Sequence, residues 1–399
     1  MTGAIGATMA VATATITEHR RAGIPHQPSA WHNRGMLCAA SRRRTARLAT
    51  VVMCLVLGGC SSLRYYTHVA HGQASLLLHR RPIAKVIGDR ATDPALAARL
   101  RLAAQARQFA SAQLELPDNR SYTSYVELHR PYVAWNVFAT PRWSVDALPQ
   151  CFPIAGCVAY RGYFEKVRAQ GRAEQLRAEG NDVWIGPVPA YSTLGWFADP
   201  VVSSMLRWDD DELAGTIFHE LAHQRLYVKD DTAFNESFAS FVERQGLREW
   251  RQARGLPPPD RRAQAMDRGF TELVLELRAQ LQRLYGSTHD EAVLQRGKQA
   301  QIEAFRRRYA HWRDSHWPGD HRYDAWVDAP INNARLLPFG LYDRWTGAFA
   351  VLFARAERQW GAFYAAARSL ADEPKAERDR ALTTLEAGTD PVGPAVGSR

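Results

Sequence analysis

The feature that most constrains this chain is a pair of histidines four residues apart, in the segment His219-Glu220-Leu221-Ala222-His223. Acidic residues open this stretch and apolar residues recur through it at helical spacing, so we predict a helix from about Asp211. Histidines at this spacing lie one turn apart on one helix face and can bind a single metal ion. A glutamate between them can hydrogen-bond a water on that ion, which is the arrangement of zinc hydrolases.

Zinc bound by two histidines needs a third protein ligand, and the next segment offers one. Glu236 lies early in a second predicted helix, for which Asp231 or Thr232 is the N-cap. The small Ala239 lets that helix approach the first one closely. We therefore expect His219, His223 and Glu236 to bind one Zn²⁺ ion. The alternative is an amphipathic core helix whose histidines happen to be four residues apart.

The N-terminal region has the pattern of an export signal. Residues 41–60 read SRRRTARLATVVMCLVLGGC, which is a basic stretch, an apolar stretch too short to span a bilayer, and a cysteine. Leu57-Gly58-Gly59-Cys60 is similar to the bacterial lipobox, whose cysteine is lipidated. We predict that residues 1–59 are an upstream extension and a lipoprotein signal peptide, with Met36 as the conventional start. An ordinary cleaved signal peptide with a chance cysteine is the alternative.

More than half of the chain's net positive charge lies in this predicted leader. The whole chain has a formal net charge of +10, but residues 1–59 hold seven Lys and Arg against one acidic residue, which is +6 and leaves +4 for the rest. So mild an excess argues against a nucleic-acid partner. Because Ser61 and Ser62 follow Cys60, with no aspartate to retain the protein at the inner membrane, we expect a lipid anchor in the outer membrane, facing the periplasm of a bacterial envelope.

We expect residues 60–372 to form one domain and residues 373–399 to be a disordered tail. Strand-like alternation occurs over residues 121–145, and helical periodicity dominates the downstream half. Another short strand near Asp182–Pro187, followed by a loop over Pro189–Trp196, precedes the first metal-binding helix. The predicted fold class is therefore α+β and mostly helical, with a small mixed sheet and a helical C-terminal region.

The two metal-binding segments resemble those of the gluzincin metallopeptidases, and Asn235-Glu236-x-x-Ala239 is similar to an element of the aminopeptidase N group. A longer stretch, from Tyr65 to about Gly246, resembles a smaller bacterial family, the putative zinc aminopeptidases, whose members are predicted lipoproteins. The segments that carry this resemblance are Leu116-Pro117-Asp118-Asn119, Pro131-Tyr132-Val133-Ala134-Trp135-Asn136-Val137, Cys151-Phe152-Pro153-Ile154-Ala155-Gly156-Cys157 and Pro189-Ala190-Tyr191-Ser192-Thr193-Leu194-Gly195-Trp196-Phe197.

The resemblance implies a zincin-like metallopeptidase core that hydrolyses peptide bonds, as an aminopeptidase or oligopeptidase of the cell envelope. In such enzymes the strand before the metal helix pairs with substrate, and Glu220 would take a proton from water and pass it to the leaving amine. The chain departs from the aminopeptidase N group in one respect. Residues 182–197 contain no glutamate that could hold the free amine of a substrate.

Three further residues are candidates for supporting roles. Tyr191 and Tyr342 could each stabilise the oxyanion of the transition state, although a packed aromatic is the alternative for both. Glu243 lies seven residues after Glu236, on the same helix face, and could orient a ligand histidine. A solvated surface charge is the alternative for Glu243.

Besides Cys60, which we expect to be lipidated, two cysteines remain after residues 1–59, Cys151 and Cys157. An even pair in an exported protein predicts a disulfide that closes a tight loop, and two buried thiols are the alternative.

Two other functions fit the same residues. One is a non-catalytic envelope lipoprotein with a structural zinc, which predicts a fourth protein ligand. The other is a metal hydrolase that cleaves amide bonds of the cell wall. The expected partners of the favoured function are a peptide substrate and, through the lipid anchor, a membrane.

Overall fold

The computed structural model describes residues 64–152, 156–339 and 344–387. The chain forms two compact units. One comprises residues 13–75, of which residues 64–75 are described and helical, and the other includes everything from Leu76 onward. The fold and the site below belong to the unit that begins at Leu76. Cys60 and the predicted signal peptide lie outside the described residues. No helix in the described ranges combines the length and apolar character that crossing a membrane requires.

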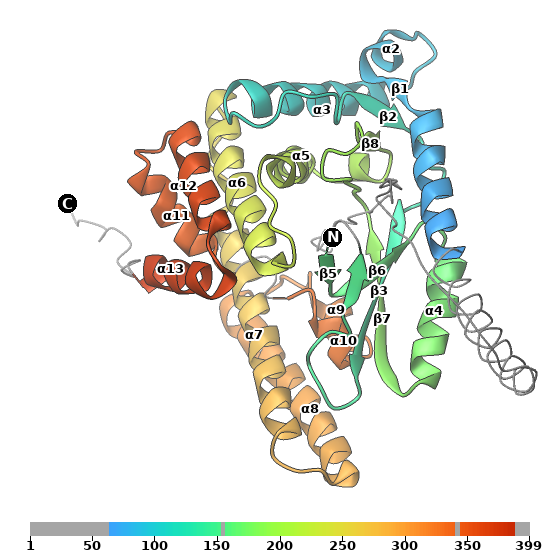
Figure 1. The fold of residues 1–399 in the computed structure, drawn as a ribbon, viewed down its shortest axis with the longest axis vertical. Coiled ribbons are helices and arrows are strands. Elements are labelled where there is room, and N and C mark those ends of the chain that lie inside the picture. The colour runs from blue at the N-terminus through green and yellow to red at the C-terminus, as the bar shows by residue number, and fades with distance from the viewer. Residues whose placement is uncertain (1–63, 153–155, 340–343, 388–399) are drawn as a thin grey trace, which may run out of the picture. The chain divides into compact units, whose positions relative to one another are not determined.

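The first elements of this unit are β1 (Arg81–Pro82), α2 (Ile83–Gly88) and the long α3 (Pro94–Ala112). Helix α3 begins as expected for an aspartate followed by proline. The Asp93 carboxylate accepts hydrogen bonds from the backbone N–H groups of Ala95 (2.9 Å) and Leu96 (3.0 Å). Its buried face of alanines and leucines packs against α5, which lies directly beneath it in Figure 1.

Two small three-stranded sheets follow. In the first, β2 (Ser124–Val126) pairs antiparallel with β1 and parallel with β8 (Val201–Val202). In the second, β3 (Ala134–Pro141) lies between β6 (Tyr160–Tyr163) and β7 (Asn181–Val188) and is antiparallel to both, so that Phe138 is opposite Tyr160 and Trp184. Strand β7 therefore contains the short strand predicted near Asp182–Pro187, and it lies at one edge of this sheet.

The second sheet is covered by helices from distant parts of the chain. Helix α4 (Lys166–Ala178) packs against β3 and β7. The short α10 (Asn333–Leu336) packs on the sheet through Ala334 and Leu337, which lie against Phe138. The Asn332 side chain caps α10 and also donates to the carbonyl of Val183 (3.1 Å), so α10 covers part of the outer edge of β7.

Two crossing helices form the centre of the unit. Helix α5 (Asp210–Arg225) begins at a capping box in which Asp209 and Glu212 bond each other's backbone N–H groups. Helix α6 (Thr232–Ala253) is capped by Asp231 and packs along α5. Glycines permit this close approach, because a Cβ at Gly215 would lie 2.9 Å from Leu247 Cδ1, and a Cβ at Gly246 would lie 3.1 Å from Phe218.

The remaining elements are helical. Helices α7 (Arg261–Tyr285) and α8 (Glu291–His316) pack against each other, and α9 (Asp324–Asp328) follows them. Helices α11 (Thr346–Arg355), α12 (Trp360–Asp372) and α13 (Lys375–Ala387) lie against α6 on the far side from the sheets. An aromatic cluster joins this group to α6: Phe238, Phe241, Phe349, Phe353 and Phe363. The fold is thus mostly helical with small sheets, in agreement with the predicted α+β class.

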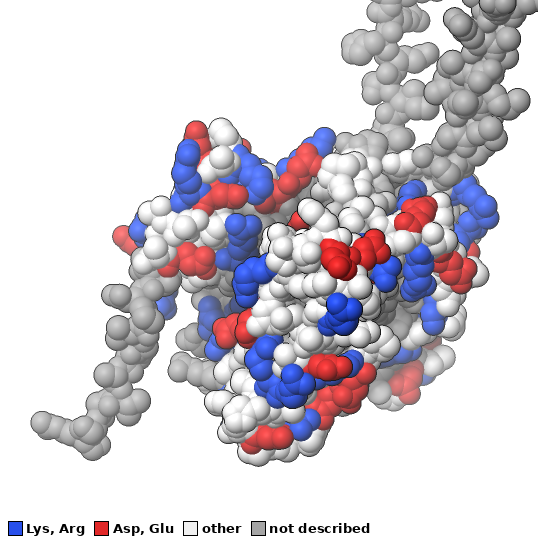
Figure 2. Space-filling view, turned by 90° about the horizontal axis from the view of Figure 1, so that it is seen from below, with Lys and Arg blue, Asp and Glu red and all other residues white. Residues whose placement is uncertain are grey.

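The expected disordered tail is wrong over much of its length, because α13 begins at Lys375 and ends at Ala387. In this helix Leu382 and Leu385 are buried and Arg378 is only 4% exposed, so the segment packs against the rest of the domain. The domain therefore extends beyond residue 372, and residues 388–399 lie outside the described residues. Over the face seen in Figure 2, basic and acidic side chains are interspersed.

Candidate metal centre

Three buried side chains from α5 and α6 meet at one point. His219 and His223 lie one turn apart on α5, and Glu236 projects from the second turn of α6. The His219 Nε2 atom is 3.1 Å from His223 Nε2 and 3.3 Å from Glu236 Oε2, and the remaining distance, from His223 Nε2 to Glu236 Oε2, is 3.6 Å. The structure therefore brings together the three predicted ligands.

The shape of this triangle fits a tetrahedral ion. In a zinc site with metal–ligand bonds of about 2.05 Å, neighbouring ligand atoms are about 3.3 Å apart. The three measured edges lie on either side of that value. Two imidazoles and one carboxylate are also a donor set that zinc prefers. The residues present thus fit a divalent ion, although the geometry does not choose among metals.

The charges of the triad favour a cation. Burial alone would raise the pKa of Glu236, but the adjacent His223 and His219 hold it at about 2, so Glu236 is an anion at neutral pH. Burial would lower the pKa of His219, yet its bonds to Glu236 and Glu243 raise it well above the usual value. Two carboxylates thus create a field around His219 that stabilises positive charge.

Glu243 is one of those carboxylates. Its Oε2 atom lies 3.0 Å from His219 Nδ1, the ring nitrogen that faces away from the triad. A contact of this kind fixes the orientation of the imidazole so that Nε2 points at the other ligands. Gly215 leaves room for it, because a Cβ there would be 3.2 Å from Glu243 Oε1.

Glu220 follows His219 on α5 and is 3% exposed. Its charge acts on two buried groups that the sequence analysis did not identify, Tyr122 and Asp199. Neither residue has a spacing signal in the sequence, because both come from irregular segments outside the metal helices. Glu220 is therefore a buried carboxyl group next to His219 in the chain and within electrostatic range of Tyr122 and Asp199.

A third residue missed from the sequence is Tyr227, just beyond the end of α5. Burial and the nearby Glu236 and Asp230 carboxylates raise the pKa of its phenol to about 12. A signal for it existed, because Tyr227 continues the four-residue spacing of His219 and His223. It places a neutral hydroxyl-bearing ring near the third ligand.

The two tyrosines proposed for the oxyanion have different outcomes. Tyr191 is 1% exposed and its ring lies 5.3 Å from that of Phe164, which is the packed position weighed as the alternative. Tyr342 lies outside the described residues. On the same loop as Tyr191, Trp196 is 59% exposed.

The connector between the two metal helices, residues 226–231, is fastened at several points. The Asn235 side chain bonds both the N–H and the carbonyl of Val228, at 2.7 Å each. At the start of α6, the buried Asp231 carboxylate accepts from the Arg378 guanidinium of α13 (2.7 Å). This explains why an asparagine precedes the ligand Glu236: it ties its helix back to the connector.

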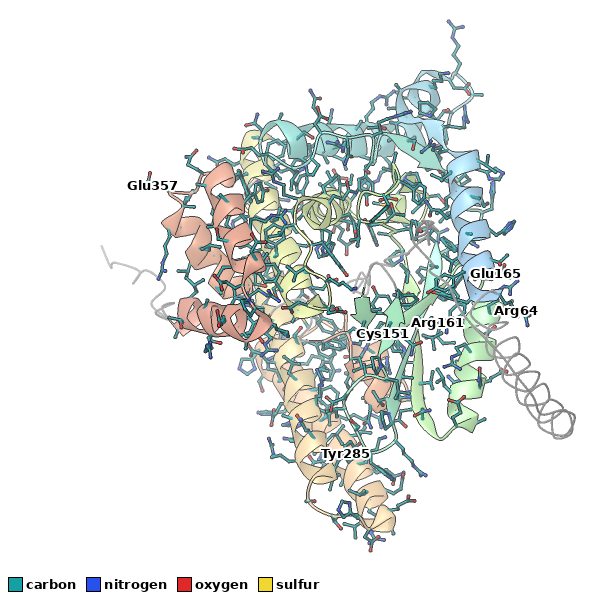
Figure 3. The ribbon with its side chains drawn as sticks, viewed as in Figure 1. Arg64, Cys151, Arg161, Glu165, Tyr285 and Glu357 are labelled. Atoms are coloured by element: carbon teal, nitrogen blue, oxygen red, sulfur yellow. A yellow bond between two sulfur atoms is a disulfide. The ribbon has the colours of Figure 1, made fainter. Side chains whose placement is uncertain are left out.

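A disulfide hairpin also touches the connector. Cys151 and Cys157 form a disulfide between β4 (Gln150–Phe152) and β5 (Gly156–Val158), and Figure 3 marks Cys151 in this hairpin. The backbone N–H of Cys157 donates to Asp230 Oδ1 (2.6 Å). Asp230 itself has a left-handed backbone, with φ of +63°. The hairpin therefore holds an irregular point of the connector.

Comparison with known proteins adds one finding to this geometry. No curated protein and no solved structure matches the chain. A family model described as putative aminopeptidase matches residues 64–382, a range that contains the three ligands, Glu220, Glu243 and the disulfide. The match covers most of the chain and extends into α13, and the chain therefore belongs to the putative aminopeptidase family.

Proposed function

We propose that this protein is a zinc-dependent peptide-bond hydrolase, an aminopeptidase or oligopeptidase of the bacterial cell envelope. The observation that carries the proposal is the triangle of His219, His223 and Glu236, with the buried Glu220 next to His219 in the chain. The family supports peptide as the substrate class. Among the residues that the structure describes, the cluster contains three ligand side chains, which leaves a position open as in catalytic sites.

Zinc held by these ligands supplies Lewis acidity towards a carbonyl and makes water a better nucleophile near neutral pH. The chain itself supplies the proton transfer. Glu220 accepts a proton from water at its carboxylate and gives it to the departing amine. The low exposure of the site excludes bulk solvent, which strengthens every charge interaction there. Glu243 keeps the His219 ring in its ligating orientation.

Substrate would lie along the edge of β7. An extended peptide pairs with an exposed strand edge. Asn332 and Asn333 at the start of α10 bond Val183 and Asp182, so substrate would pair with β7 beyond Val183. Trp196, exposed on the following loop, offers an apolar contact for a side chain next to the cut. Strand β7 carries no glutamate, so an amine anchor of the aminopeptidase N kind does not lie on it.

The envelope location rests on the sequence. We propose that Cys60 carries a lipid and that the protein faces the periplasm from the outer membrane. Fractionation of cells expressing a Cys60→Ser variant tests this proposal. Release of that variant from the membrane is the expected result, and unchanged membrane association contradicts it.

Digestion of a peptide library by zinc-loaded, full-length protein, read by mass spectrometry, tests the function. Glu220→Gln is the matched variant, since its amide keeps the shape but accepts no proton. It should retain zinc and lose at least ~100-fold in turnover. Near-normal turnover in Glu220→Gln contradicts the mechanism. Cleavage of crosslinked cell-wall peptides but of no library peptide would assign the activity to cell-wall amides instead.

One peptide prepared with a free and with an acetylated N-terminus separates the two kinds of peptidase. Cleavage of the free form alone shows an aminopeptidase, and would mean that a carboxylate outside β7 holds the amine. Equal cleavage of both forms shows an oligopeptidase.

A further inference from the structure

A cavity of about 580 Å³ opens between α2, α3 and the loop of residues 117–123. Apolar side chains from both helices form part of its wall: Ile83, Ile87 and Ala104. Polar side chains form another part and include Arg107, Ser111 and Asp118. The three predicted zinc ligands do not line it. Cavities of this size that combine apolar walls with a few polar groups are typical of sites for small molecules.

Arg107 of α3 is the buried cation of this cavity, at 5% exposure. Its guanidinium donates to the carbonyls of Pro117 (2.9 Å), Asn119 (2.7 Å) and Ser121 (2.8 Å) and to the Ser111 hydroxyl. Within the described residues these bonds engage four of the five N–H donors that a guanidinium has. They explain how the loop is held, and they leave one N–H on Nη1 for a further acceptor.

The charge of Arg107 is not neutralised by those bonds, because every acceptor is a neutral oxygen. Among the residues that the structure describes, its carboxylate contact is with Asp118, whose Oδ1 atom lies 3.6 Å from Nη2. That distance is longer than a hydrogen bond, and the Asp118 side chain is 91% exposed. Buried charges in proteins are normally paired, so an anion that enters the cavity would supply the closer partner that Arg107 lacks.

The pair of Arg107 and Asp118 presents opposite charges next to each other on one wall. The complement of such a pair is a molecule with a carboxylate and an ammonium group close together. In an α-amino acid both groups are attached to one carbon atom, so they can meet both charges at once. In a peptide the two termini are separated by at least one further residue, so a peptide would meet only one of them.

The polar wall is also held from outside the cavity. The Asn119 side chain donates to Gln224 Oε1 at the end of α5 (2.8 Å), and Gln224 Nε2 donates to the Ser121 hydroxyl (3.3 Å). Asn119 Oδ1 in turn accepts from the backbone N–H of Ser121 (2.9 Å). The loop is thus fixed on both sides, and a site formed before its ligand arrives binds at a lower entropic cost.

We propose that this cavity binds a free α-amino acid with an aliphatic side chain. The carboxylate would lie against Arg107, the ammonium group against Asp118, and the side chain against Ile83, Ile87 and Ala104. The site goes beyond the proposed hydrolysis and does not depend on it, although a peptidase that acts on hydrophobic residues would release such a ligand.

Calorimetric titration of the full-length protein with leucine and its analogues tests the chemistry of the ligand. Leucine should bind saturably. Leucinamide lacks the carboxylate and should bind at least ~10-fold more weakly, as expected when a buried charge loses its bonds. Isocaproate lacks only the amine and should bind about 5-fold more weakly, because the exposed Asp118 contributes less. Leucyl-leucine should also bind more weakly than leucine.

Two variants place the bound leucine in the cavity. Asp118→Asn should weaken leucine about 5-fold and leave isocaproate unchanged, whereas Asp89→Asn, an exposed aspartate after α2, should change neither. Ala104→Phe fills the cavity and should abolish binding of both. Ala98→Phe is its control, because Ala98 is an exposed alanine of the same helix. If Ala104→Phe does not fold, Ala84→Phe on the exposed side of the opposite wall replaces it.

Three results would overturn the proposal. One is the absence of saturable leucine binding. The second is binding that survives both Asp118→Asn and the cavity-filling variant, since leucine would then lie elsewhere, for instance at the metal centre. The third is isocaproate that binds as tightly as leucine, which would remove the amine from recognition. Because binding is measured, a protein that cleaves no peptide would refute the proposed function without changing this answer.

Discussion

The metal centre is held from two sides by different forces. On one side α5 packs against α6, and Gly215 and Gly246 leave room for Leu247 and Phe218 of the facing helix. On the other side the connector of residues 226–231 is held by polar contacts, to Asn235, to the disulfide hairpin and to Arg378. Apolar packing sets the distance between the two helices. The hydrogen bonds of the connector set the residue at which α6 begins, and this fixes the position of Glu236 relative to the two histidines. We therefore expect substitutions on the helix-packing side and on the connector side to have different effects on metal binding and on stability.

The largest effect should come from removing ligands, because each side contributes at least one. His219→Ala, His223→Ala and Glu236→Ala should each lose bound zinc after dialysis, since two ligands rarely retain it. Metal analysis of the purified variants measures this. Full zinc occupancy in Glu236→Ala would show that Glu236, the residue positioned by the connector, is not a ligand.

The next effect is expected at the connector. Arg378→Ala leaves Asp231 as a buried charge without its main partner, which should cost about 3–5 kcal/mol of unfolding free energy in denaturant titrations. Lys375→Ala is the control, because Lys375 contacts the same carboxylate from an exposed position (3.4 Å) and should cost less than about 1 kcal/mol. Equal losses from both variants would show that burial does not decide the strength of this contact.

A smaller effect should follow at the crossing. Glu243→Gln keeps the size of the side chain but weakens its bond to His219 Nδ1, so zinc affinity should fall by about 10- to 100-fold. Competition with a chelator measures it. Glu249→Gln, also on α6 but bonded to Trp360, serves as the control. An unchanged zinc affinity in Glu243→Gln would show that the contact with His219 Nδ1 does not contribute to metal binding.

The smallest effect concerns pH. In metal-free protein the pKa of His219 is raised by its carboxylate partners, so its pairing stabilises the fold fully below the unfolded histidine value of about 6.5. That contribution is lost as the pH rises through the folded pKa. The unfolding temperature of metal-free protein should therefore decrease from pH 6 to pH 9 more than that of His219→Ala. Parallel pH curves for the two proteins would contradict the pairing.

The parts of the centre that could be predicted from sequence are those with a local signal. The spacing of His219 and His223 and the helix start at Asp231 are properties of a single helix or turn, so they appear in the sequence. The choice of Glu236 as their partner followed from the need for a third ligand and from its place early in the next predicted helix. The structure agrees with each of these placements.

The parts that could not be predicted depend on contacts between distant segments. Tyr122 and Asp199 meet through one backbone bond between two irregular loops, and no periodicity marks either residue. The burial of Tyr191 depends on Phe164, which belongs to another element. Helix α13 was not predicted because its sequence contains few apolar residues. It is held by the burial of those few residues and by the ion pair of Arg378 with the distant Asp231.

The bond between Arg378 and Asp231 also has a consequence for the order in which the protein matures. The partner of Asp231 lies more than a hundred residues downstream, so the start of α6 lacks this contact until nearly the whole chain has emerged into the compartment where it folds. A chain that has emerged only as far as α12 holds His219, His223 and Glu236, but it has an unneutralised anion at the beginning of the helix that presents Glu236. Competence to bind metal at this triad would thus be acquired last.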